Sequence, residues 1–328
     1  MAQLGLTFAS LGALGIPASV AVAQRAEELG YDSFWTAEAN GNEAFTLLGA
    51  AGQATKIIGL GTGVLPITIR TPTLTAMGAA TLQALHPERE ILLGIGISSP
   101  AVAGQWHGAA PSKERPLAQV REYLTVMREV FTGETVNFQG DFYNIKKFRL
   151  AVRLGERKPK IIIGALNAGM LKLAGELADG ALLNYLPASH VPWSVEQVRA
   201  GGKADIYAYI HAGVIDDHAA GLELARRDLF GYAVAPAYAK MFAAAGYADE
   251  MATLIAANKV GDREGAIHAI SERMAYDIDT MGDAAHVHSF VESYRAAGVT
   301  HPVLMPLPWG KDRRAVTEAT MLAAAGIL

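Results

Sequence analysis

Short apolar segments and amphipathic helical patterns alternate eight times along this chain, and this alternation limits the fold more than any other feature. The strand-like segments are rich in Ile, Leu and Val and apolar on both faces, and they cover residues 4–9, 33–39, 57–66, 90–98, 160–166, 180–186, 205–215 and 301–309. Strands that are buried on both faces are typical of a parallel sheet covered by helices. Eight such units predict an α/β protein with a (β/α)8 TIM barrel.

The chain is longer than a plain barrel requires. A barrel needs about 250 residues, whereas this chain has 328. We assign the excess to insertions at about 99–116, 135–159 and 218–285, the largest being a helical block between strand 7 and strand 8, and we expect residues 1–328 to form a single domain. The alternative is an open doubly wound sheet, which usually carries a GxGxxG phosphate turn after an early strand. The only similar run, GLGTG at 59–63, lies inside the third strand.

Composition excludes several classes of function. The net charge of −4 gives no reason to expect a nucleic acid or an anionic membrane surface as partner. With no cysteine, the chain has no disulfide, thiolate metal site or cysteine nucleophile. We find neither a signal peptide in MAQLGLTFAS nor an apolar run near the roughly 20 residues of a membrane helix. We therefore expect a cytoplasmic protein that acts on a small molecule.

The third strand raises a question of its own. The stretch IIGLGTGVLPITIRTPTL places Gly59, Gly61 and Gly63 in an otherwise apolar strand, which then continues into Pro66. Glycine weakens a strand and leaves nothing to pack. Either these glycines allow a bulge and the curvature of the barrel, or a flat molecule lies against the backbone there.

The carboxyl ends of the strands, where a barrel carries its functional site, contain little charge. Glu38 is the only carboxylate expected at these ends and His211 the only histidine. A metallohydrolase would need several His and Asp there and a Schiff-base enzyme a lysine, so we expect no metal site. What remains is glycine, small polar groups and apolar surface, which suit a flat, largely apolar ring held by backbone amides.

Two further segments are candidates for the site. Asn167, Ala168 and Gly169 precede a helix whose free amides can hold a phosphate, although asparagine is also an ordinary N-cap residue. His107 lies in the first insertion, a possible lid, and can act as a proton donor or be a surface histidine. Arg70 follows the third strand, where an exposed loop arginine is the simpler interpretation.

Several motifs together resemble the bacterial luciferase-like flavin monooxygenases, and within them the branch that uses the deazaflavin coenzyme F420. The motifs are RAEELGYDSFWTAEA (25–39), LGTGVLPITIRTP (60–72), ILLGIGISSP (91–100) and LKLAGELADGALLN (171–184). The resemblance covers nearly the whole chain. It implies a bulge with a cis peptide between Gly63 and Val64, which presses the backbone against the cofactor ring.

The same resemblance implies the other site residues. Glu38 is implied as a catalytic and cofactor-binding acid, and the strand 4 loop, Gly96, Ile97, Ser98 and Ser99, as a contact for the ring edge and tail. The start of the next helix, Asn167, Ala168, Gly169 and Met170, is implied to contact the phosphate region. Sugar-phosphate dehydrogenases of the family carry a histidine after the acid, but this chain has Ala39 there.

Three functions follow as hypotheses. The first is an F420-dependent oxidoreductase that transfers a hydride between the deazaflavin and an organic substrate, with Glu38 and His107 as catalytic residues. The second is an FMN-dependent monooxygenase that uses reduced flavin and dioxygen. The third is a flavin- or deazaflavin-binding protein without turnover. The resemblance also implies a homodimer.

Overall fold

The computed structural model describes residues 3–9, 14–99, 101–109 and 115–328. Its centre is a ring of eight parallel strands: β1 (Gly5–Thr7), β2 (Ser33–Thr36), β3 (Gly59–Pro66), β4 (Ile91–Gly96), β7 (Lys160–Gly164), β8 (Gly180–Leu183), β9 (Asp205–Val214) and β11 (His301–Pro306). Neighbours in this order pair in parallel, β11 pairs with both β9 and β1, and β8 pairs with β9. These pairings close the ring, so the predicted TIM barrel is confirmed.

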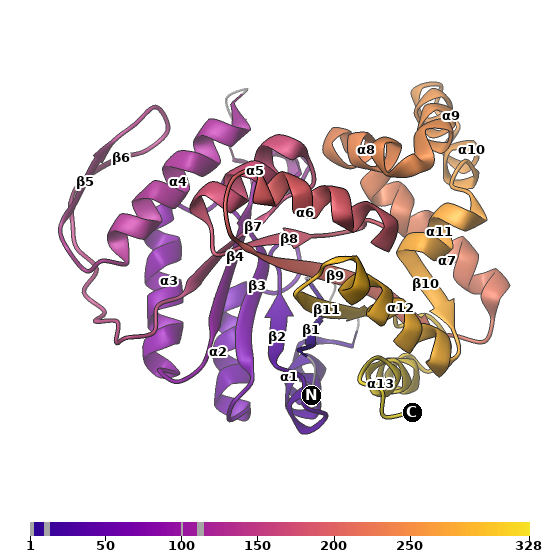
Figure 1. The fold of residues 1–328 in the computed structure, drawn as a ribbon, viewed down its shortest axis with the longest axis horizontal. Coiled ribbons are helices and arrows are strands. Elements are labelled where there is room, and N and C mark those ends of the chain that lie inside the picture. The colour runs from indigo at the N-terminus through magenta and orange to yellow at the C-terminus, as the bar shows by residue number, and fades with distance from the viewer. Residues whose placement is uncertain (1–2, 10–13, 100, 110–114) are drawn as a thin grey trace.

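Helices surround this ring, as Figure 1 shows. The barrel helices are α1 (Ile16–Glu28), α2 (Ala44–Ala54), α3 (Pro72–Leu85), α4 (Pro116–Val130), α5 (Ala168–Leu177), α6 (Val191–Arg199), α12 (Ala284–Ala297) and α13 (Arg313–Ala324). Proline occupies the first turn of α1, α3, α4 and α6, where its missing N–H costs nothing. Within the described residues, no helix is long and apolar enough to cross a membrane.

The interior of the ring is a small, separate core of large side chains. It contains Trp35, Leu92, Ile162, Leu182, Tyr207, Tyr209, Val303 and Met305. Along β9 the side chains of Tyr207 and Tyr209 both belong to this core, so every second residue of the strand faces inward. His211, two residues further along, therefore faces the barrel mouth, which places it among the residues at the strand ends.

Two segments outside the barrel units lie within the ranges 99–116 and 135–159. A π-helical turn, η1 (Ala101–Trp106), follows β4, and an antiparallel hairpin of β5 (Val136–Gln139) and β6 (Asn144–Phe148) follows α4. The hairpin packs outside α4, at the left of Figure 1. Glu122 of α4 fixes its turn by accepting hydrogen bonds from the backbone amides of residues 141–143. A short 3₁₀ turn, η2 (Ala188–His190), precedes α6.

The third insertion corrects one prediction. Its helices are α7 (His218–Ala233), α8 (Pro236–Phe242), the π-helical η3 (Ala243–Tyr247), α9 (Ala248–Lys259), α10 (Arg263–His268) and α11 (Glu272–Ile278). The prediction of helix almost throughout was wrong at β10 (Asp279–Gly282), which pairs in parallel with the last residues of β9. The segment DTMG is too short for its apolar content to distinguish a strand from a helix end. This extra strand sets His211 directly opposite Asp279.

Candidate functional site

The bulge of β3 forms one wall of the barrel mouth. The pairing of β3 with β4 shifts register between Thr62 and Leu65, and the peptide bond between Gly63 and Val64 is cis, as the resemblance implied. The carbonyl oxygen of Val64 accepts a hydrogen bond from the amide of Glu38, 3.3 Å away, so the bulge is joined to the end of β2. The bulge thus presents backbone rather than long side chains to the mouth.

Glycines of the strands β4 and β7 make room for this bulge. A methyl group added at Gly94 would lie 2.0 Å from the carbonyl oxygen of Thr62. Added at Gly96 or at Gly164, it would lie 2.9 Å from a methyl of Val64. Atoms that close overlap, and packed interiors have little free volume in which to move. These glycines of β4 and β7 are therefore required by close approach. In β3 itself, a methyl at Gly61 would overlap the ring of Trp35 and one at Gly63 the hydroxyl of Tyr209, so side chains of the barrel interior require those two glycines.

The loop after β4 continues this wall. Ile97 is half-buried and packs against the core, while Ser98 has a left-handed backbone (φ 69°) that a non-glycine residue rarely adopts. Ser99 accepts a hydrogen bond on its hydroxyl from the amide of Val102, 3.2 Å away, and so caps the π-helical turn η1. Strained backbone of this kind gathers at functional sites, and Ala9 and Tyr185, which follow β1 and β8, share it.

Glu38 has a partner that the sequence analysis did not assign. Arg70 donates from Nε and Nη2 to the two carboxylate oxygens of Glu38, at 2.8 and 2.7 Å, and it also binds Glu43. The Arg70 side chain is only 16% exposed, so the interpretation of it as an exposed loop residue was wrong. Its hydrogen bonds to Glu38 raise the pKa of Arg70. The Glu38 carboxylate is therefore held as an anion in a fixed, bidentate pair.

His107 approaches the end of β2 from the η1 loop. Its Nε2 lies within hydrogen-bond distance of the carbonyl oxygen of Ala39, the position where the resemblance expects a histidine. The imidazole is exposed, and its neighbour Trp106 is 55% exposed. The two candidate catalytic residues, Glu38 and His107, thus meet at the carboxyl end of the same strand.

The start of α5 is open to binding. Asn167 is the N-cap residue of α5, but its side chain makes no capping hydrogen bond. Its side-chain nitrogen Nδ2 instead donates to the carbonyl oxygen of Ala237 in α8, 3.2 Å away. Ala168 and Gly169 are exposed and Met170 is half-buried. No side chain of the described residues caps the first-turn amides of α5, and such amides attract an anion. The uncapped first-turn amides and the exposure of Ala168 and Gly169 agree with the predicted phosphate contact.

A second group of polar residues lies on the opposite wall of the mouth, and sequence reasoning found only one of its members. His211 of β9, Asp279 of β10 and Asp228 of α7 lie together, with one ligand atom of each within 4.8 Å of the others. Burial lowers the pKa of His211 to about 4 and raises that of Asp228 to about 7. Burial also raises the pKa of Asp279 well above its ordinary value. Asp228 and Asp279 were missed because both fall in the insertion that was assigned as plain helix.

Aromatic side chains of the insertion cover this group. Tyr185 stacks at 3.9 Å between ring centroids on His211 and on Tyr232, and Tyr238 packs edge-on against Tyr232. Met241 and Phe242 of α8 are fully buried. The apolar residues of α8 therefore serve helix packing.

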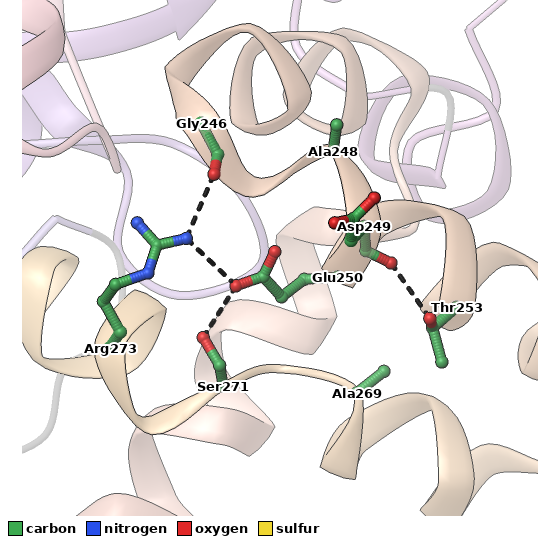
Figure 2. A pocket seen from close by; sticks show the side chains of 8 residues that line it. All are labelled: Gly246, Ala248, Asp249, Glu250, Thr253, Ala269, Ser271 and Arg273. Carbon is green, nitrogen blue, oxygen red and sulfur yellow. Dashed lines mark hydrogen bonds and ion pairs between the residues drawn. The ribbon is translucent and has the colours of Figure 1, made fainter.

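A pocket in the insertion is lined by none of the site residues named above. It is a shallow hollow of about 520 Å³ between η3, α9 and α11. Figure 2 shows Arg273 and Ser271 both directed at Glu250, with hydrogen bonds of 3.2 and 2.8 Å to its Oε1. Arg273 also donates to the carbonyl oxygen of Gly246. These polar groups pair with one another, so the pocket serves to hold the helices together.

Comparisons with known proteins agree with this geometry. The chain matches the family model described as Luciferase-like monooxygenase over residues 7–301. The chain belongs to this family. The match spans most of the chain and includes the β3 bulge, the β4 loop and the start of α5.

Three relatives illustrate the similarity. A Mycobacterium tuberculosis protein provisionally named a coenzyme F420-dependent oxidoreductase is 29% identical over 92% of this chain and 94% of its own length. An F420-dependent glucose-6-phosphate dehydrogenase of Nakamurella multipartita is 34% identical, over 50% of each chain. The structure of a coenzyme F420-dependent tetrahydromethanopterin reductase from Methanopyrus kandleri superposes with a TM-score of 0.80, covering 98% of this chain and 97% of that one at 22% identity. That last likeness supports the fold.

Proposed function

We propose that this protein is an F420-dependent oxidoreductase that transfers a hydride between the deazaflavin and an organic substrate. The observation that carries the proposal is the glycine-lined bulge of β3, in which Val64 is seated between Gly96 and Gly164. It offers a flat backbone surface at the strand ends, where a barrel enzyme of this family has its site. The relatives named after F420 support this cofactor over FMN.

The residues of the mouth fit such a cofactor. Gly63, Val64 and Gly96 would lie against the ring, and Ile97, Ser98 and Ser99 against its edge and tail. The first turn of α5, from Asn167 to Met170, would bind the phosphate with free amides, as helix starts commonly do. When bound, the deazaflavin supplies the hydride chemistry, and it differs from FMN because carbon at ring position 5 does not form the flavin peroxide.

The side chains at the end of β2 would handle the proton. Glu38 is held by Arg70, so we assign it the role of an anion that orients its neighbours and the cofactor. His107 lies within hydrogen-bond distance of the backbone carbonyl oxygen of Ala39, and its imidazole is exposed. We assign His107 the transfer of a proton to or from the substrate. The lid position of η1 would let this loop exclude water.

A pair of titrations tests the cofactor. The purified protein without cofactor is titrated with F420 and, separately, with FMN, and binding is followed by absorbance and by ligand fluorescence. Tight binding of F420 alone supports the proposal, whereas tight binding of FMN alone moves the function to dioxygen chemistry. Tight F420 binding without turnover of any unsaturated or oxidised substrate in a broad screen favours a carrier, and binding of neither ligand refutes the cofactor assignment.

Variants then test the catalytic assignment. With a substrate found in the screen, His107→Asn should lower kcat by about 10²- to 10⁴-fold, as loss of a general acid does, and leave F420 binding unchanged. His288→Asn, at an exposed histidine of α12, is the matched control. If the kcat of His107→Asn is unchanged, another group transfers the proton, and the cofactor assignment is unaffected. The homodimer, the cytoplasmic location and the expectation that nucleic acid and membranes are not partners stay predictions.

A further inference from the structure

The group formed by His211, Asp228 and Asp279 has no role in the proposed hydride transfer. Its side chains come from three separate elements, β9, α7 and β10, and converge below the aromatic cover of the insertion. Strand register holds two of them together, because His211 and Asp279 are direct partners in the β9–β10 pair. Burying one imidazole and two carboxylates together costs free energy, so some favourable interaction must offset that cost.

The buried atoms of this group lack partners. The side chain of His211 is 1% exposed and that of Asp279 is fully buried. Within the described residues, Nδ1 of His211 lies 3.2 Å from Oδ1 of Asp279, and neither this nitrogen nor the carboxylate oxygens of Asp279 have a hydrogen-bond partner outside the group. The ion pairs found in the described part of the chain place no lysine or arginine on Asp228 or Asp279. Two carboxylates thus share one buried site with an imidazole and without a lysine or arginine.

The hydrogen bonds around His211 orient a lone pair toward Asp279. Nε2 lies 3.0 Å from Oδ1 of Asn184, whose amide nitrogen donates to the hydroxyl of Tyr238 at 3.1 Å. With that amide orientation, the proton is on Nε2 and Nδ1 is an acceptor. Nδ1 then faces Oδ1 of Asp279 at 3.2 Å. Two acceptors this close are held together by a shared positive centre, which is either a proton on Nδ1 or a metal ion.

The spacing suits a metal ion. Bonds of about 2.1 Å from one ion to an imidazole nitrogen and a carboxylate oxygen separate those atoms by about 3.0 to 3.4 Å at octahedral to tetrahedral angles. An outer hydrogen bond from the other ring nitrogen is the usual companion of a histidine ligand, and Asn184 provides it. Asp228 is oriented in the same way, because the hydroxyl of Tyr185 donates to its Oδ2 at 2.7 Å.

We propose that His211, Asp228 and Asp279 bind a divalent transition-metal ion, Zn²⁺ or Mn²⁺. The two carboxylates balance the charge of the ion, and one imidazole with two carboxylates is a donor set that both metals accept. Tyr185 and Tyr232 close the site, so the ion is structural. It ties the insertion helix α7 to strands β9 and β10, and through them fixes the insertion over the barrel mouth. The sequence analysis expected no metal because β10 was not recognised.

Metal content tests the proposal directly. The untagged full-length chain is produced in medium supplemented with ZnCl₂ or MnCl₂, desalted, and analysed by inductively coupled plasma mass spectrometry. We expect about one ion per chain for the metal that the site prefers. Asp279→Asn and Asp228→Asn should each lose it. His268→Asn is the matched control, because His268 lies 3.6 Å from Glu223 in an exposed pair on the same insertion.

Thermal unfolding gives a second readout. Removal of the ion, by a chelator present during unfolding and refolding, should lower the melting temperature by about 5 °C or more, because the ion binds only the folded chain. Asp279→Asn should lower it similarly. If no ion is present, Asp279→Asn removes an unpaired buried charge and leaves the melting temperature unchanged or higher, which would overturn the proposal.

Two further outcomes complete the test. An ion retained at full stoichiometry by both Asp variants lies elsewhere and refutes this site. If neither variant folds, the wild-type chain refolded with Co²⁺ decides, because coordination by His211 gives a visible absorption spectrum that free Co²⁺ in the same buffer lacks. A wild-type chain with neither bound metal nor such a spectrum also refutes the proposal.

Discussion

The two walls of the barrel mouth are built on opposite principles. At β3 and β4 the wall is backbone, with glycines at the points where the bulge approaches Gly94, Gly96 and Gly164. At β9 and β10 it is side chain, with His211 and Asp279 buried under aromatic rings. The first wall leaves an open surface for a flat ligand, and the second seals polar groups away from solvent. One end of a barrel can therefore hold a binding surface and an internal polar site at the same time.

The largest expected effect is at the backbone wall. Gly94→Ala would bring a methyl 2.0 Å from the Thr62 carbonyl oxygen, which belongs to the paired strand and cannot move aside. We expect the free energy of unfolding to fall by more than about 3 kcal/mol, measured by urea denaturation. Gly231→Ala, in α7 with open space around it, should be neutral or slightly stabilising. Equal stability of the two variants would mean that β3 and β4 do not approach this closely.

The ion pair at the end of β2 should rank second. Arg70→Met leaves Glu38, whose side chain is 8% exposed, without its bidentate partner. Breaking a buried pair costs 3–5 kcal/mol, and because Arg70 is 16% exposed we expect about 2–3 kcal/mol. Adding Glu38→Gln should recover part of the loss in a double-mutant cycle. Full additivity of the two losses would show that the pair does not form in solution.

The packing of Val64 against Gly96 should give a smaller and more specific effect. Gly96→Ala places a methyl 2.9 Å from a Val64 methyl, and we expect about 1–2 kcal/mol of destabilisation with weaker F420 binding. Val64→Ala in the same chain should restore both, because it removes the contacted methyl. The measurement is unfolding together with an F420 titration of all three variants. If the double variant is as unstable as Gly96→Ala and binds F420 as weakly, the added methyl at position 96 does not act through the Val64 side chain.

The smallest effect should come from the polar wall. Tyr185→Phe removes the 2.7 Å hydrogen bond to Asp228 and keeps the ring that stacks on His211. We expect a loss of about 1 kcal/mol in stability and unchanged F420 affinity. A large change in F420 affinity would show that the two walls act as one site and not as two independent ones.

Sequence reasoning went furthest where local pattern decides structure. The strand and helix alternation predicted the barrel, and the position of His211 at the carboxyl end of a predicted strand placed it at the mouth. Asp279 was missed because a four-residue strand inside a helical block carries too weak a period to be recognised. The partner of Glu38 was missed because Arg70 lies 32 residues away along the chain, and only the fold of β3 against β2 brings them together.

By itself, the sequence determined the closed barrel and the glycines of the third strand, because hydrophobic period and the absence of side chains act over a few residues. Only the tertiary structure decided what those glycines accommodate, that Glu38 is held by Arg70, and that His107 stands beside Ala39. It also decided that His211, Asp228 and Asp279 meet. Charge pairing and close packing depend on distances between segments far apart in the chain, and no local pattern records those distances.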